Sequence, residues 1–166
     1  GSFPEKNLRK TNFISEGDIC VETVLGSIMM FKKQDILEIG LYDENFFLYF
    51  LDDELCRRIR DTKKAVVQVL SVKATHAHGQ IKVRNPLKKT FLRHFNFTFD
   101  ELYYFYKIKR HEKKLKELED KIPKYFIKLI LNLIVLRINR IVYFLSNKIA
   151  YYKFKKLLDK KNISNI

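Results

Sequence analysis

Residues 44–60 read ENFFLYFLDDELCRRIR, a run in which aromatic side chains pass directly into acidic ones. The aromatic part consists of Phe46, Phe47, Tyr49 and Phe50. The acidic part consists of Asp52, Asp53 and Glu54. Two arginines, Arg57 and Arg58, follow within one helical turn. Charged and aromatic side chains ordinarily segregate in a soluble protein, so this run calls for a structural or a chemical explanation.

The simplest explanation for the three carboxylates is a helix cap. The pattern of residues 52–64 predicts a helix, and Asp52 or Asp53 would cap it. The second explanation is general-base chemistry, because apolar walls raise the pKa of a carboxylate and neighbouring arginines lower it. The composition of the segment leaves both explanations open.

The charge of the chain is distributed unevenly. The 166 residues carry a formal net charge of +14. Residues 82–166 hold 22 Lys and Arg and 7 Asp and Glu, whereas residues 1–81 hold 11 and 12. This asymmetry indicates that the second half meets a polyanion, either an anionic membrane surface or nucleic acid. The two cysteines, Cys20 and Cys56, form no disulfide framework and favour a reducing cytoplasm.

Residues 1–81 are predicted to form a mixed α/β part. Apolar residues predict strands at 20–31 and 65–72, with a close backbone approach at Gly26 and Ser27. Between them, residues 32–40 predict a short helix that stops at Gly40.

Residues 82–166 show only helix signals from Pro86 onward, over 86–95, 98–120 and 122 to about 158. In the last segment, apolar residues recur at helical spacing and are interrupted by Lys124, Lys128, Arg137, Arg140 and Lys148. No stretch of ~18 residues is free of charge, which argues against a membrane-spanning helix. Three interpretations stay open for residues 122–158: a helix lying on an anionic membrane surface, a helix packed on its own domain, and a nucleic-acid-binding helix.

The ordered segments resemble the second half of the catalytic domain of bacterial family 2 glycosyltransferases, in particular the rhamnosyltransferase-like branch. That family shows a small-residue strand, a stretch of the form iGgFDExFFxYxEDxDLcxRi, and then a strand and an HxxGxS loop. The matching positions here are Gly26, Gly40, Asp43, Glu44, Phe46, Phe47, Tyr49, Asp52, Leu55, Cys56, Arg58, Ile59, His76 and Gly79. The resemblance covers residues 20–81 well and residues 82–106 loosely.

The resemblance implies the GT-A fold, an α/β sandwich that binds a nucleotide-diphospho-sugar, followed here by an all-helical basic tail. It implies inverting transfer of a sugar, rhamnose being the commonest in this branch, from a nucleotide-sugar donor to a polysaccharide or glycolipid acceptor. The family's general base falls on Asp52, which would take the proton of the acceptor hydroxyl. The aromatic side chains of residues 46–50 would shape the acceptor side.

Further site roles follow from the same resemblance. The residues expected on the acceptor side are Asp43, Glu44, Phe47, Tyr49, Asp53 and Glu54. His76 inherits a contact with the metal or the donor diphosphate, although a His-x-His pair alone is a weak metal signal. Arg58 is expected to pair with an acid of its own helix or of the loop before it.

Three of the departures from the family pattern concern the candidate site. Leu51 replaces the glutamate before the base, Glu54 replaces an aspartate, and Ile81 replaces the serine of the histidine loop. These changes leave the identity of the acceptor open, and Asp53 is a second candidate for part of the base's role.

The donor side of the family is the larger departure. Its Asp-x-Asp motif, which holds Mg²⁺ or Mn²⁺ on the donor diphosphate, has no counterpart before residue 20. We therefore expect the donor-binding N-terminal half to be missing from this chain and the chain to be inactive alone. We expect residues 1–81 to be the acceptor-side half and residues 82–166 to be a basic region. That region would keep the protein cytoplasmic and peripheral on the inner face of the cell membrane. The alternative is a non-enzymatic basic module that binds anionic membrane or nucleic acid, which leaves residues 43–58 unexplained.

Overall fold

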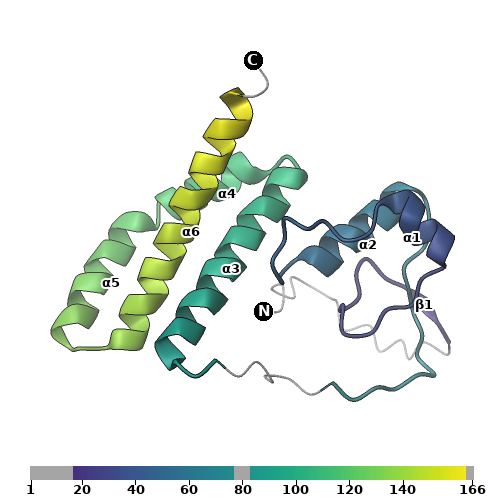
Figure 1. Ribbon diagram of the computed structural model, residues 1–166, viewed down its shortest axis with the longest axis horizontal. Coiled ribbons are helices and arrows are strands. Elements are labelled where there is room, and N and C mark those ends of the chain that lie inside the picture. Colours follow the sequence, from purple (N-terminus) through teal and green to yellow (C-terminus); the bar gives the residue numbers. More distant parts are fainter. Residues whose placement is uncertain (1–16, 77–82, 164–166) are drawn as a thin grey trace.

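Two parts follow one another in the computed structural model, which describes residues 17–76 and 83–163 (Figure 1). The first part contains β1 (Ile19–Cys20), α1 (Lys33–Ile39), α2 (Leu51–Asp61) and β2 (Val67–Gln68). The second part contains α3 (Pro86–Lys107), α4 (His111–Glu119), α5 (Ile122–Ile134) and α6 (Ile138–Ile163). Figure 1 shows short elements joined by long loops in the first part and long helices in the second.

The expected α/β sandwich is wrong, because the described residues are mainly helical and contain a single two-stranded sheet. β1 and β2 pair in antiparallel register over two residues each, Ile19 with Gln68 and Cys20 with Val67. The longer strands expected at 20–31 and 65–72 do not form. A two-stranded ladder buries little apolar surface and is marginal by itself, so an apolar run without further neighbouring strands does not extend it.

The first part packs around α2. Its small core consists of Leu55, Cys56, Ile59 and Val66. The predicted helix stop at Gly40 is confirmed: Gly40 has a φ of 92°, in the left-handed region, and its N–H donates to the carbonyls of Ile36 and Leu37. The loop between β1 and α1 and helix α1 itself cover this core with partly buried side chains, namely Val21, Val24, Met29, Ile36 and Ile39.

The second part is built on the contact of α3 with α6. The Thr98 hydroxyl lies 3.0 Å from the side-chain oxygen of Asn147. Further along both helices, the rings of Phe99 and Phe154 meet edge to face at 6.0 Å. In both pairs, the later residue of α3 contacts the later residue of α6, so the two helices run parallel. Figure 1 shows α6 between α3 and α5. The core of this part also includes Phe46, which joins the two parts.

Two helix breaks lie at positions that carry neither glycine nor proline. The helices expected at 86–95 and 98–120 are instead an unbroken α3, a turn at Lys109, and α4. The helix expected from 122 to about 158 is divided into α5 and α6 by a turn at Leu136. Lys109 and Leu136 have φ values of 54° and 53°, a conformation that neither residue type favours by itself. Among the described helices, none combines the length and the apolarity that crossing a membrane requires.

Candidate functional site

The loop that precedes α2 is held by a buried carboxylate from α3. Asp100 is fully buried and accepts hydrogen bonds from the backbone N–H groups of Phe47, Leu48 and Tyr49, at 3.1, 3.0 and 2.8 Å. Burial raises the pKa of Asp100, and these three bonds oppose the rise because they favour the charged form. Asp100 therefore fixes the aromatic loop from 51 to 53 residues away in sequence.

The start of α2 differs from the expected cap. Its N-terminal flanking residue is Phe50, in a left-handed conformation with φ 61°, and no side chain caps the helix. Asp52 and Asp53 lie in the first turn, where a negative charge favours the helix dipole, but their hydrogen bonds go to other segments. The prediction that one of them is the cap is therefore wrong.

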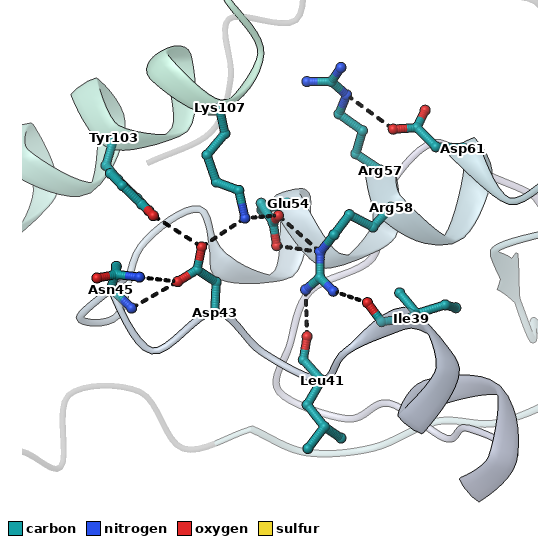
Figure 2. Close-up of polar contacts among 10 residues, drawn as sticks. All are labelled: Ile39, Leu41, Asp43, Asn45, Glu54, Arg57, Arg58, Asp61, Tyr103 and Lys107. Atoms are coloured by element: carbon teal, nitrogen blue, oxygen red, sulfur yellow. Dashed lines mark hydrogen bonds and ion pairs between the residues drawn. The ribbon is translucent and has the colours of Figure 1, made fainter. Parts of the chain in front are cut away.

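An ion-pair cluster joins the loop, α2 and α3 (Figure 2). Lys107 of α3 pairs with Asp43 at 2.7 Å and also with Glu54, whose side chain is almost completely buried. The Tyr103 hydroxyl donates to Asp43 at 3.2 Å. Burial acts to raise the pKa of Asp43, but hydrogen bonds from Lys107 and Asn45 outweigh it and hold that pKa well below its usual range. Asp43 and Glu54 are thus structural acids.

Arg58 completes the cluster from the other side of α2. Its Nε lies 2.9 Å from Oε1 of Glu54, and the prediction that Arg58 pairs with an acid of its own helix is confirmed. Its two terminal nitrogens donate to the backbone carbonyls of Ile39, at 2.6 Å, and Leu41. Arg58 therefore ties α2 to the end of α1, as Figure 2 shows.

Asp52 and Asp53 belong to a different environment from their neighbour Glu54. Oδ2 of Asp52 accepts the Gly26 N–H at 2.8 Å, and Oδ1 of Asp53 accepts the Thr23 hydroxyl at 2.7 Å. Within residues 17–76 and 83–163, neither carboxylate forms an ion pair. A Cβ on Gly26 would lie 3.4 Å from Asp52, so the expected close backbone approach is confirmed at Gly26.

Tyr42 lies near these two acids and was not among the site residues predicted from the sequence. The pKa of Asp53 is raised, mainly by burial and further by the charge of Asp52, while the Thr23 bond opposes the rise. The pKa of Tyr42 is raised by burial and then by the nearby charge of Asp52. Its phenol donates to the sulfur of Met29 at 3.3 Å. The only signal for Tyr42 in the sequence was its place directly before Asp43.

The four aromatic residues of the loop do not form one wall. Phe46 is buried against Tyr103, with ring centroids 4.9 Å apart, and Phe50 packs against Phe97 and Tyr104. Phe47 is 69% exposed and is the loop aromatic best placed to meet a ligand. Phe46 and Phe50 serve the core instead of an acceptor.

Tyr49 lines a hollow of about 420 Å³ in the helical part. Positive and aromatic side chains contribute to its wall, among them Arg93, Phe97, Lys121 and Tyr143. Asp52 does not line this hollow. The structure therefore separates Tyr49 from the Gly26–Asp52 contact.

The remaining predicted site residues lie at the surface or outside the described residues. Glu44 is exposed, and His76 lies exposed in the segment after β2. His78, Gly79 and Ile81 of the histidine loop lie outside the described residues. In the part of the chain that the structure describes, no three His, Cys, Asp or Glu side chains gather to hold a metal ion. The described residues thus do not fit a donor-metal site, and a metal role for His76 stays a prediction.

Comparisons with known proteins return no match: no protein-family model, no curated protein and no solved structure is similar to this chain. The resemblance of residues 20–106 to family 2 glycosyltransferases therefore stays a prediction from the sequence.

Proposed function

We propose that this chain carries the acceptor side of an inverting glycosyltransferase, with Asp52 as the general base. The contact between Asp52 and Gly26 carries this proposal. It fixes one carboxylate oxygen with a neutral donor and leaves the other oxygen outside any hydrogen bond or ion pair with the described residues. A general base needs such an oriented carboxylate, because a strong ion pair would lower its basicity.

The ion pairs of the neighbouring acids also support a general-base role for Asp52. Asp43 and Glu54 take up the positive charges of Lys107 and Arg58. Among the described residues, Asp52 forms no ion pair. A helix cap does not need this arrangement, whereas a proton acceptor does.

The proposed reaction begins when Asp52 takes the proton of an acceptor hydroxyl. The acceptor oxygen then forms a bond to the anomeric carbon of the donor sugar, and the bond from that carbon to the diphosphate breaks with inversion. Phe47 is the aromatic residue proposed to contact the acceptor, a polysaccharide or lipid-linked glycan, since sugar rings have apolar faces. Asp53, with its raised pKa, lies beside the base and would hydrogen-bond a second acceptor hydroxyl.

The donor side is proposed to come from polypeptide outside this sequence. The first part leaves large apolar side chains in water, among them Leu25 at 77%, Met30 at 97% and Val72 at 66%. Such surface normally marks a contact with another protein part. A nucleotide-sugar site with Mg²⁺ or Mn²⁺ would lie in that part, and the described residues supply no step through the metal.

Glycan binding by the chain tests this function. Saturation-transfer NMR against a panel of mono- and oligosaccharides should detect contacts with at least one glycan, and Phe47→Ala should weaken them. The exposed Val72→Ala variant is the matched control and should bind as the parent does. Absence of binding to every glycan would contradict the acceptor role.

A second measurement tests the division between donor and acceptor sides. The chain alone should not hydrolyse nucleotide sugars in the presence of Mg²⁺ or Mn²⁺. Robust turnover would support the enzyme but overturn the proposal that the donor side lies elsewhere.

A further inference from the structure

The turn between α5 and α6 forms an exposed apolar tip, which we define as residues 133–138. The backbone N–H of Arg137 donates to the carbonyl of Asn132 at 2.9 Å and closes the end of α5. Leu136, in the left-handed conformation, then reverses the chain into α6. Figure 1 shows this turn at the end of the helical part opposite the C-terminal end of α6.

Apolar residues dominate the tip, yet they are not buried. Their exposed fractions are 50% for Leu133, 73% for Ile134, 62% for Val135, 78% for Leu136 and 54% for Ile138. The exposed apolar surface continues along α5 through Phe126, Ile127, Ile130 and Leu131. A contiguous apolar surface of this kind marks a site of interaction.

Only one side of α6 is exposed beyond its first turns, where Leu145, Ile149 and Tyr152 remain accessible. Phe144 and Ser146 are buried, and Ala150 and Phe154 further along the helix are completely buried. These residues face α3 or α5, so this side of α6 belongs to the core. The helix of residues 122–158 is therefore not exposed all round, and the largest run of exposed apolar residues lies on α5 and the tip.

The charge around the tip is of one sign. Residues 121–158 contain no Asp or Glu and nine Lys or Arg. The basic residues nearest the tip are Lys124, Lys128, Arg137, Arg140 and Lys148, and all of them are exposed. No ion pair of the described residues involves any of these five.

We propose that the α5–α6 tip inserts into the interface of an anionic lipid bilayer. Its aliphatic side chains would enter the acyl boundary, and the surrounding Lys and Arg would meet lipid phosphates. The 13 residues of α5 span about 20 Å, which is shorter than the ~30 Å hydrocarbon core, so the hairpin lies at the surface and does not cross.

The charge pattern favours lipid over the two other occupants. A second copy of the chain would bring like charges together at the same surface without an acid to neutralise them. Nucleic acid would satisfy the basic side chains but would leave Ile134 and Leu136 in water. An anionic bilayer satisfies both the basic and the apolar groups.

Vesicle co-sedimentation tests the partner. The chain should bind phosphatidylcholine vesicles that contain a third phosphatidylglycerol at least about tenfold more strongly than pure phosphatidylcholine vesicles. The double variant Ile134→Ser and Leu136→Ser should lose most of this binding. Its matched control, Leu25→Ser and Met30→Ser, removes two exposed apolar side chains from the first part and should bind as the parent does.

Two double charge-reversal variants distinguish binding by the basic residues beside the tip from binding by the net charge of the whole chain. Lys124→Glu with Lys128→Glu, beside the tip, should abolish binding to anionic vesicles. Lys156→Glu with Lys160→Glu makes the same change in net charge at the far end of α6 and should reduce binding much less. Equal losses in both pairs would overturn the local surface proposed here.

The depth of insertion has a direct reporter because the chain contains no tryptophan. Leu136→Trp should show a blue-shifted emission with anionic vesicles and quenching by brominated lipids, whereas Met30→Trp should show neither. An unquenched Leu136→Trp would overturn the proposal. Vesicle binding that does not depend on lipid charge would also overturn it. The same holds if the chain self-associates, or binds nucleic acid in a salt-sensitive way, and does not bind vesicles. None of these measurements depends on glycosyl transfer, so the proposed function can fail independently.

Discussion

The backbone N–H of Gly26 donates a 2.8 Å hydrogen bond to Oδ2 of Asp52 and joins the loop after β1 to the first turn of α2. An asparagine at position 52 can accept the same bond through its side-chain oxygen, but it is not a base at neutral pH. The two possible roles of Asp52, orientation of the loop and removal of a proton, can therefore be separated by substitution.

Asp52→Asn should fold like the parent and lose catalysis. We expect a fall in kcat of roughly 100- to 10,000-fold, the usual contribution of a general base. The measurement is sugar transfer by a form that includes the donor-binding part, with circular dichroism to verify the fold. Asp61→Asn, which neutralises an exposed acid at the other end of α2, is the control and should keep most of the activity. Full activity of Asp52→Asn would remove Asp52 from the mechanism.

Substitutions of Gly26 should depend on size. A single Cβ would meet Asp52 at 3.4 Å, an ordinary contact, so Gly26→Ala should change the free energy of unfolding by less than about 0.5 kcal/mol. Gly26→Val adds two methyl groups toward the same side chain and should cost about 1–3 kcal/mol. Urea denaturation measures both values. Equal stability of the two variants would show that the loop moves away from α2 without cost.

Lys107 should contribute strongly to stability, because it links α3 of the second part to Asp43 and Glu54 of the first part. Lys107→Met removes the cation shared by Asp43 and Glu54, whose side chains are only 16% and 4% exposed. Asp43 would lose its ion pair and Glu54 would keep only Arg58, which should lower the free energy of unfolding by about 2–4 kcal/mol. Lys155→Met removes a cation from a surface pair with Glu119 and should cost less than about 1 kcal/mol. Similar losses in the two variants would contradict a structural role for the cluster.

Asp43 should make stability depend on acid pH. Its folded pKa is lowered, so its stabilisation is fully present above the unfolded value of about 3.9 and is lost as pH falls through the lower folded value. The difference in unfolding free energy between the parent and Asp43→Asn should therefore be constant from neutral pH to about pH 5 and shrink below pH 4. Urea titrations at stepped pH measure this difference, and a constant difference down to pH 2 would refute the assignment.

The sequence predicted the elements whose ends are set by local chemistry. Gly40 stops α1 in the left-handed conformation, and Asn85 accepts from the N–H groups of Leu87 and Lys88 just before Pro86 opens α3. The close approach at Gly26 was also predicted, because a glycine within an apolar run often marks a place where another segment comes near the backbone. In each case one residue type determines the outcome.

The predictions from the sequence were wrong where contacts between residues far apart in the chain determine the structure. The strands stayed short because the described residues supply no further strand to cover their apolar faces. The turns at Lys109 and Leu136 have no local signal in the sequence, since they accompany the packing of α4 against α3 and of α5 against α6. Lys107 and Asp100 gave no sign that they would bind the acidic–aromatic segment, because one sequence does not show contacts between residues more than 50 positions apart.

Asp100 supports the clearest prediction from such a distant contact. Asp100→Ala would leave three loop N–H groups, those of residues 47–49, without their acceptor in a partly buried site. We expect a loss of about 2–4 kcal/mol in unfolding free energy. Amide hydrogen exchange of residues 47–49 should accelerate far more than that of the α6 core around Phe154. Asp100→Asn retains one acceptor oxygen and should lie between the parent and the alanine variant in both measurements. Unchanged exchange at residues 47–49 in Asp100→Ala would show that the aromatic loop keeps its shape without α3.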